Sequence, residues 1–205
     1  MKLYFAPGAC SLSPHIVLRE LGLPFDLVKV DLGAKKTSDG SDFKAINPKG
    51  YVPALLTDDG QVLTEGPALV QYLADRKPEA KLAPANGSFA RYQLQEWLNF
   101  ISTEIHKSFS PLFNPAMPDA AKEIYMAKLK QRFAELDVVL ATQDFLTGAQ
   151  FSVADAYLYT VLRWTTPFKI DLNQWPALAR YFARVDTRPA VKAALDAEAA
   201  AKKAG

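Results

Sequence analysis

The sequence predicts a mixed α/β domain followed by an all-helical domain, and three observations support this fold class. Within residues 1–75, strand-like and helix-like stretches follow the order β-α-β and then β-β-α, which is typical of a small sheet with a βαβ half and a hairpin half. Residues 77–88 are rich in Pro, Ala and Gly, as linkers are. Beyond this linker we find no convincing strand pattern. We therefore expect one domain at 1–80 and a second domain at 87–205.

Each element of the first domain is predicted by a local pattern. Ser and Pro residues after the first apolar strand favour a helix start, because Ser caps helices and Pro fits their first turn. The stretch FDLVKV alternates apolar and polar residues, and Asp58-Asp59-Gly60 is typical of a hairpin. The elements expected in order are a strand at 3–5, a helix from 11–14 to 22, a strand at 25–30, a loop at 31–41, a helical turn at 43–46, strands at 54–56 and 61–63, and a helix from 64–67 to 75.

The second domain is predicted to be helical throughout. A long helical pattern covers 89–109 and is interrupted by prolines, and a second one covers 119–141. A third helix starts near Val153, where Ser152 and Asp155 have the spacing of a capping box, so Asp155 is interpreted as structural rather than catalytic. Pro176 and Pro189 open two shorter helices.

The only cysteine, Cys10, lies between the first strand and the first helix. Backbone amides and the positive end of the dipole at a helix N-terminus favour a thiolate and any anion bound beside it. A lone cysteine is also a common small buried apolar residue. The position alone therefore leaves two roles open, a reactive thiol and a core residue.

Two stripes run along the predicted helix 89–109 if it keeps 3.6 residues per turn. An apolar stripe for the core comprises Leu94, Leu98, Ile101 and Ile105. Beside it lies a stripe of small polar residues, Asn99, Thr103, His106 and Ser110. Such groups suit hydrogen bonding in a cleft, and they also suit a partly buried face whose members bond to one another. The other histidine, His15, is interpreted as a surface or capping residue.

Composition excludes several classes of function. The formal net charge is +2 with both signs interspersed, so no basic stripe for nucleic acid is present. One Cys and two His give no disulfide framework and no pattern of metal ligands. The sequence shows no basic and apolar leader and no apolar run of membrane-spanning length. We therefore expect a cytoplasmic protein that uses no metal, binds no nucleic acid and contacts no membrane.

Several long stretches resemble one known family. KLYFAPGACSLSPHIVLRE, INPKGYVPAL, LTEGPALVQYLAD, EWLNFISTEIHKSF and SVADAYLYTVLRW are similar, in order and spacing, to the cytosolic glutathione transferase superfamily and to its bacterial beta class in particular. The resemblance implies a thioredoxin-like glutathione-binding domain at 1–80 and an all-helical domain at 87–205 that carries the site for the second substrate. It also implies glutathione as co-substrate, a homodimer and a role in detoxification.

The resemblance also assigns roles to individual residues. Cys10 and His106 match the pair at the glutathione sulfur, and Val52-Pro53 matches the motif whose proline is cis, which would turn the Val52 backbone toward the glutathione backbone. Glu104 matches a residue that reaches the site across the dimer. The implied glutathione-binding set is Cys10, Lys35, Val52, Pro53, Glu65, Gly66, Asn99, Thr103, Glu104, His106 and Lys107. The family usually has Ser where this chain has Gly66, so weaker glutathione binding is expected.

The main hypothesis is attack of the glutathione thiolate on small apolar electrophiles. Phe113, Trp164 and Phe168 would form an aromatic rim around the electrophile. The alternative for Phe113 and Phe168 is packing in the core. Three alternatives stay open. The first is a glutathione-dependent thiol-disulfide reductase with Cys10 as nucleophile, although Ser13 stands where a resolving Cys would be. The second is another reaction on the same scaffold, such as dehalogenation or isomerisation, and the third is a non-catalytic binder of apolar ligands.

Overall fold

The computed structural model describes residues 1–203, which form two compact units. The first unit consists of Met1–Lys81 together with the chain from Thr187 onward, and the second consists of Leu82–Asp186. A mixed α/β part followed by a helical part is therefore confirmed. The expected second domain, 87–205, stays a prediction. In the structure the residues after Asp186 belong to the first unit. The last two residues of the chain lie outside the described part.

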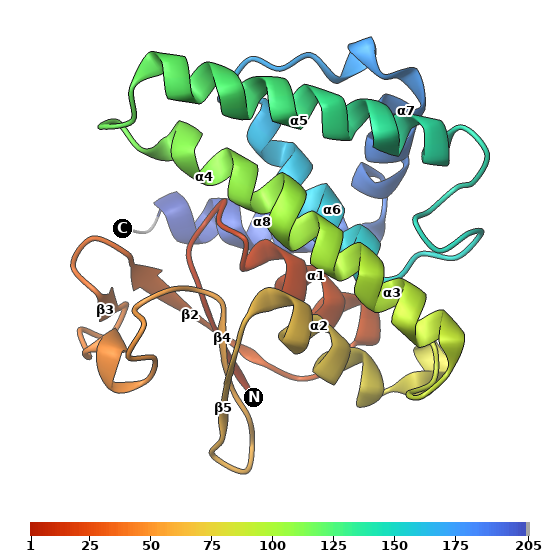
Figure 1. Ribbon diagram of the computed structural model, residues 1–205. Helices are drawn as coiled ribbons and strands as arrows, with labels where there is room; N and C mark the ends of the chain where they lie inside the picture. Colours follow the sequence, from red (N-terminus) through yellow and green to blue (C-terminus); the bar gives the residue numbers. More distant parts are fainter. Residues whose placement is uncertain (204–205) are drawn as a thin grey trace. The chain divides into compact units, whose positions relative to one another are not determined.

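The first unit is built on one sheet of five strands in the order β3-β2-β1-β4-β5 (Figure 1). Strands β1 and β2 are parallel and joined through a helix, while β4 and β5 form an antiparallel hairpin whose β4 pairs antiparallel with β1. This is the predicted combination of a βαβ half and a hairpin half, and it has the thioredoxin-like arrangement. The strands are β1 (Lys2–Phe5), β2 (Asp26–Asp31), β3 (Lys36–Thr37), β4 (Ala54–Leu56) and β5 (Val62–Thr64).

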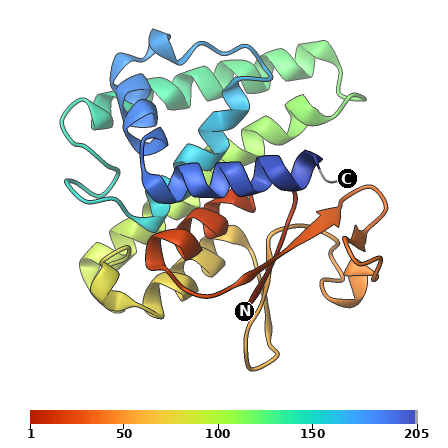
Figure 2. The same cartoon turned by 180° about the vertical axis from the view of Figure 1, so that it is seen from behind.

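Three helices complete this unit: α1 (Leu12–Leu21), α2 (Gly66–Asp75) and α8 (Pro189–Lys203). Helix α1 contacts both α2 and α8, and Figure 2 shows α8 lying beside it. Because α1 is covered by these neighbours, its residues are mostly buried, including polar ones such as His15. Two short 3-10 turns, Phe43–Ala45 (η1) and Pro78–Ala80 (η2), also belong to the unit.

Two local predictions in the first unit need correction. The loop expected at 31–41 contains the short strand β3, whose two residues pair with the end of β2. Ser11 occupies the N-cap position of α1 but makes no capping bond, because its Oγ lies 3.2 Å from both the backbone nitrogen and the backbone oxygen of Ala6. Ser11 therefore ties the loop before the helix instead of capping the helix.

The second unit is helical in all its regular elements, and α6 lies at its centre. All ten residues of α6 are buried, and α6 contacts α3, α7 and the segment η3. The predicted core stripe is confirmed, since Leu94, Leu98, Ile101 and Ile105 are each at most 1% exposed. The elements are α3 (Phe89–Phe100), η3 (Ile101–His106), α4 (Lys107–Phe113), α5 (Asp119–Leu140), α6 (Val153–Leu162), η4 (Arg163–Thr165), η5 (Leu172–Gln174) and α7 (Pro176–Asp186).

The helix predicted at 89–109 is not a regular α-helix. Ile101–His106 is π-helical, and the helix then continues through Pro111 to Phe113. A π-helix bonds residues five apart instead of four, so the spacing of 3.6 residues per turn does not hold across this segment. The hydroxyls of Thr103 and Ser108 donate to carbonyls four residues earlier, a pattern that competes with regular helix bonds.

Among residues 1–203, no helix is long and apolar enough to cross a membrane.

Candidate active site

The loop after β1 presents Cys10 at the start of α1. The half-buried Cys10 thiol donates a hydrogen bond to the backbone carbonyl of Val52, with 3.3 Å between Sγ and the oxygen. Gly8 has φ +76°, and nothing lies within 4 Å of a Cβ built there, so backbone conformation is what favours glycine at this turn. The sole thiol is thus held at the N-terminus of α1, beside the Val52 carbonyl.

The Val52 carbonyl is positioned by the core beneath it. The Val52 side chain is buried with Tyr4 and Phe43, whose ring centroids are 5.7 Å apart. The Val52-Pro53 bond is cis, as the resemblance implies. Val52 and Cys10 therefore come together from segments 42 residues apart in the chain.

Glu65 and Gly66 lie at the N-terminus of α2. Glu65 has φ +70°, an uncommon conformation for a residue with a side chain, and its exposed carboxylate pairs with Lys49 at 2.9 Å. A Cβ built on Gly66 would meet only the Ser13 Oγ, at 4.0 Å. Because Ser13 belongs to α1, the first turns of α1 and α2 lie close together, and both offer positive dipole ends to an anion.

Lys35, a member of the implied glutathione-binding set, reaches back toward the segment before the cis proline. It has φ +57°, and its Nζ donates to the Gly50 carbonyl at 3.0 Å. The same ammonium lies 5.6 Å from the centre of the Tyr51 ring, and Tyr51 is 68% exposed. The Lys35 side chain therefore contacts the segment that leads into Val52, at the Gly50 carbonyl two residues before it.

A buried network that the sequence did not reveal supports the Cys10 loop. The Glu198 carboxylate on α8 accepts the Gly8 amide at 2.9 Å with one oxygen and lies 3.4 Å from His15 Nδ1 with the other. Arg19 Nε donates to His15 Nε2 at 2.9 Å, so His15 carries its proton on Nδ1, toward Glu198. The interpretation of His15 as a surface or capping residue is wrong: it is fully buried because α8 covers this side of α1.

Replacing Glu198 with Gln should loosen the Cys10 loop, because one amide oxygen then replaces two carboxylate oxygens. The first unit is expected to lose about 1–3 kcal/mol of stability, the usual effect of leaving a buried donor unpaired. The rate at which a thiol reagent modifies Cys10 in increasing urea measures this, since no other cysteine competes. Asp196→Asn, on the exposed side of α8, is the control and should leave the rate unchanged. Equal rates in Glu198→Gln and wild type would contradict the anchoring role.

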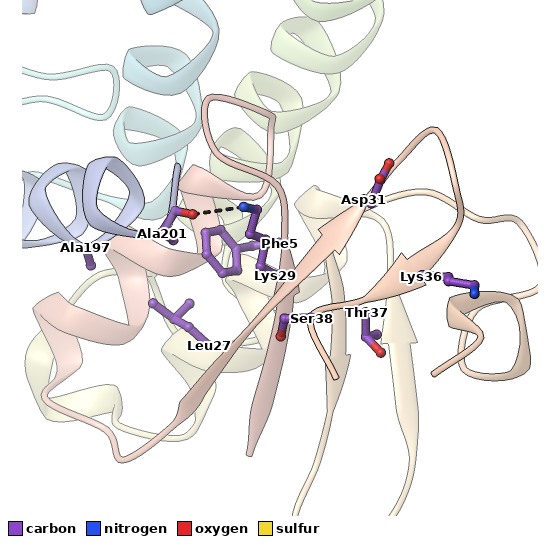
Figure 3. A pocket seen from close by; sticks show the side chains of 9 residues that line it. All are labelled: Phe5, Leu27, Lys29, Asp31, Lys36, Thr37, Ser38, Ala197 and Ala201. Carbon is purple, nitrogen blue, oxygen red and sulfur yellow. Dashed lines mark hydrogen bonds between the residues drawn. The ribbon is translucent and has the colours of Figure 1, made fainter. Parts of the chain in front are cut away.

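A cavity of about 630 Å³ in the first unit lies away from these residues, between β2, β3 and α8. Figure 3 shows its side chains, with Lys29 donating to the Ala201 carbonyl at 2.9 Å. Leu27 and Ala197 line it with apolar surface. No residue predicted for the site lines this cavity, so it is a separate feature of the unit.

In the second unit, His106 ends the π-helical segment inside an aromatic cluster. Its Nδ1 lies 2.6 Å from the Tyr157 hydroxyl, and its ring centroid lies 4.9 Å from that of Trp164. Of the three residues predicted for the electrophile pocket, Phe113 contacts the other two, with ring centroids 5.5 Å from Trp164 and 4.8 Å from Phe168. Tyr157 was not predicted, although it lies seven residues before Trp164 in the stretch that carried the resemblance.

The remaining predicted residues lie along α3, η3 and α4. Asn99, Thr103 and Lys107 are exposed, and Thr103 donates to the Asn99 carbonyl at 3.1 Å. The Glu104 carboxylate pairs with Lys128 at 3.2 Å and Arg132 at 2.8 Å. The hydrogen bond from Lys128, together with that from Arg132, holds the pKa of Glu104 below its usual range. Its expected reach across a dimer stays a prediction.

Between Met1 and Lys203, no group of three or more His, Cys, Asp and Glu side chains could hold a metal ion.

Comparison with known proteins identifies the family. The family model for the glutathione S-transferase N-terminal domain matches residues 8–76, and the model for the glutathione S-transferase C-terminal domain matches residues 100–189. The chain belongs to the glutathione S-transferase family. The resemblance seen in the sequence is thereby confirmed. The N-terminal model matches within the predicted α/β region, and the C-terminal model matches within the predicted helical region.

Similar glutathione S-transferases span nearly the whole chain. Glutathione S-transferase GstA of Escherichia coli O157:H7 is 48% identical over 198 residues, which cover 97% of this chain and 98% of that protein. A sphingomonad glutathione S-transferase solved in complex with glutathione is 51% identical, with a TM-score of 0.95 and coverage of 97% and 99%. The bacterial beta class enzyme of Sphingomonas chungbukensis is 48% identical, with a TM-score of 0.94 and coverage of 97% and 98%. The chain is therefore an enzyme of the glutathione S-transferase type.

Proposed function

We propose that this enzyme binds glutathione along the segment that joins Cys10 to Val52 and uses its thiolate to attack small apolar electrophiles. The observation that carries the proposal is the position of the sole thiol at the N-terminus of α1, 3.3 Å from the Val52 carbonyl. An extended peptide that pairs with the Val52 backbone there would place its own sulfur beside that helix terminus. The dipole and amides then favour the thiolate form.

The other predicted contacts follow the charges of glutathione. The γ-glutamyl end carries a carboxylate and an ammonium, which suit the helix terminus at Gly66 and the carboxylate of Glu65 respectively. Lys35 would hold the glycyl carboxylate. The second unit would contribute His106 at the sulfur, with Phe113, Trp164 and Phe168 as the apolar wall. The further predicted contacts are Pro53, Asn99, Thr103, Glu104 and Lys107.

The proposed reaction is a substitution. The glutathione thiol loses its proton to water, the sulfur forms a bond to an electrophilic carbon, and the leaving group departs with its electron pair. Holding both reactants in one orientation supplies much of the rate, because it replaces a bimolecular encounter by a local one. Detoxification in the cytoplasm, by a homodimer, is the setting that we propose.

Calorimetry with glutathione and a conjugation assay with 1-chloro-2,4-dinitrobenzene test the proposal. We expect saturable glutathione binding and release of chloride with formation of the aryl thioether. Binding of glutathione without turnover of any tested aryl halide would favour another reaction on the scaffold. Absence of glutathione binding, together with tight binding of an apolar dye, would contradict the proposal and favour a non-catalytic binder.

Gly66→Ser should tighten glutathione binding. The added Cβ meets only the Ser13 Oγ at 4.0 Å, so the side chain fits, and its hydroxyl can donate to the γ-glutamyl carboxylate. A hydrogen bond to a charged group contributes roughly 1.5–3 kcal/mol, so the dissociation constant should fall about 10- to 100-fold. Gly66→Ala is the matched control, since it adds the Cβ without the hydroxyl. An unchanged dissociation constant in Gly66→Ser, measured by calorimetry, would contradict the prediction that the Ser hydroxyl strengthens glutathione binding.

A further inference from the structure

The hydrogen bond between Tyr157 and His106 has a consequence for the chemistry of His106. The Tyr157 hydroxyl lies 2.6 Å from His106 Nδ1, and Tyr157 is only 2% exposed, within the fully buried helix α6. His106 itself is half-buried at the end of η3. A buried hydroxyl at this distance from a ring nitrogen keeps it as a persistent partner, because leaving the hydroxyl unpaired in the interior is costly.

Contacts with neighbouring rings hold the His106 imidazole in the orientation that makes this hydrogen bond. Trp164 packs against His106 at 4.9 Å with an angle of 72° between the ring planes, and Tyr157 packs at 5.8 Å with an angle of 75°. Trp164 is in turn held by Phe109, at 5.7 Å and 86°. Two edge contacts and one hydrogen bond therefore restrain the side-chain torsions of His106, so that Nδ1 stays directed at Tyr157.

The pairing selects one tautomer of the neutral ring. A neutral imidazole has one nitrogen that carries the proton and one that accepts. A phenol is a stronger donor than an imidazole N–H, and an imidazole nitrogen is a stronger acceptor than a phenol oxygen. The favourable arrangement is therefore an O–H of Tyr157 donating to Nδ1, which leaves the ring proton of His106 on Nε2.

We propose that Tyr157 is a positioning residue that holds His106 as the Nε2–H tautomer, so that His106 donates a hydrogen bond to the glutathione thiolate and does not accept the thiol proton. The catalytic part of this inference rests on the proposed function. The thiol proton passes to water, and the His106 ring stays neutral throughout. A donor at the sulfur stabilises the charged form and lowers the pKa of the bound thiol.

The tautomer can be measured without any activity. In uniformly ¹⁵N-labelled protein, long-range ¹H–¹⁵N correlation distinguishes protonated from unprotonated ring nitrogens, and the chain has only two histidines. His106→Asn assigns the spectrum by removing one set of signals. At a pH where the ring is neutral, we expect His106 to show a protonated Nε2 and an unprotonated Nδ1. A protonated Nδ1 in the wild type would overturn the proposal.

Tyr157→Phe removes the donor but keeps the ring that packs against His106. We expect the His106 signals to move toward a mixture of the two tautomers, while the buried His15 signals stay in place and report an intact fold. Tyr159→Phe is the matched control, because Tyr159 lies on the same helix and bonds to Asp186 instead. An unchanged His106 pattern in Tyr157→Phe, or an equal change in Tyr159→Phe, would overturn the proposal.

A second readout tests the donor role. The ultraviolet absorbance of bound glutathione thiolate gives the pKa of the bound thiol, which should rise by about one to two units in Tyr157→Phe if the bond from Nε2 is weakened. An altered tautomer with an unchanged thiol pKa would overturn the donor role. If the wild type bound no glutathione, the proposed function would fail, and the tautomer measurement would still decide whether Tyr157 sets the His106 proton.

Discussion

If the enzyme also reduces glutathionylated disulfides, Cys10→Ala should abolish that activity and reduce the proposed conjugation much less. In disulfide reduction the Cys10 thiolate attacks a glutathionylated disulfide, forms a mixed disulfide with glutathione and releases the other thiol. A second glutathione then releases oxidised glutathione and restores Cys10. No atom of alanine can replace that sulfur, so a loss of roughly three orders of magnitude or more is expected, as for other enzymes that lose their nucleophile.

Conjugation makes a different demand on Cys10. In the proposed conjugation the attacking sulfur belongs to glutathione, and Cys10 would contribute a hydrogen bond beside it. The loss of one charge-assisted hydrogen bond corresponds to roughly 1.5–3 kcal/mol, or about a 10- to 100-fold decrease in kcat/KM. The ratio of the two activities is therefore the decisive quantity.

Both assays are run on wild type, Cys10→Ala and Ser13→Ala. Ser13→Ala is the control because Ser13 Oγ bonds to the Cys10 carbonyl at 3.0 Å and carries no thiol. Mass spectrometry after incubation with oxidised glutathione should show one glutathionyl group on wild type and none on Cys10→Ala, since the chain has one cysteine. Disulfide reduction that survived in Cys10→Ala, or equal loss of both activities, would refute the separation of roles.

Most of the first unit could be predicted because most of its elements are specified locally. The apolar strand at Lys2–Phe5, the alternating strand at Asp26–Asp31 and the helix opened by Gly66 and Pro67 follow from residues within a few positions. Strand β3 was missed because its two residues are defined by pairing with β2, and their own side chains are polar. A strand of two polar residues that is defined only by its pairing with another strand has no alternating pattern in the sequence.

The network around His15 could not be predicted for a related reason. Glu198 lies 183 residues from His15 in the chain, and only the packing of α8 on α1 brings the two side chains together. Local patterns predict neither this contact nor the burial that follows from it. A histidine in the first turn of an amphipathic helix therefore suggests exposure until the neighbouring helix is known.

The candidate site was predictable where chemistry depends on a local position and unpredictable where it depends on contacts. Cys10 was identified by its position at a helix start, and Gly66 by the resemblance; the structure adds the bond from Cys10 to Val52. Trp164 came from the resemblance and Phe113 was expected either at the rim or in the core, while the partner of His106 on α6 was not predicted. The π-helical segment that ends at His106 has no sequence pattern distinct from an α-helix.

Asp155→Ala should strongly destabilise the second unit. The predicted capping box is confirmed, and the Asp155 carboxylate does more than cap: it accepts hydrogen bonds from the Ser152 amide and hydroxyl, from the Leu146 amide and from the Tyr181 hydroxyl. The carboxylate is fully buried, and burial raises its pKa. Alanine would leave several interior donors unpaired at about 1–3 kcal/mol each, partly offset by removal of the desolvation cost, so we expect a net loss of about 3–5 kcal/mol.

The positions of the reporter residues allow this loss to be assigned to one unit. All three tryptophans lie within Leu82–Asp186, so urea unfolding followed by tryptophan fluorescence reports the second unit, while the modification rate of Cys10 reports the first. The fluorescence midpoint should fall sharply in Asp155→Ala. Asp171→Ala is the matched control, since that exposed carboxylate caps a single short turn and contributes about 1 kcal/mol. A loss below about 1 kcal/mol in Asp155→Ala would show that the buried donors find other partners when the carboxylate is removed.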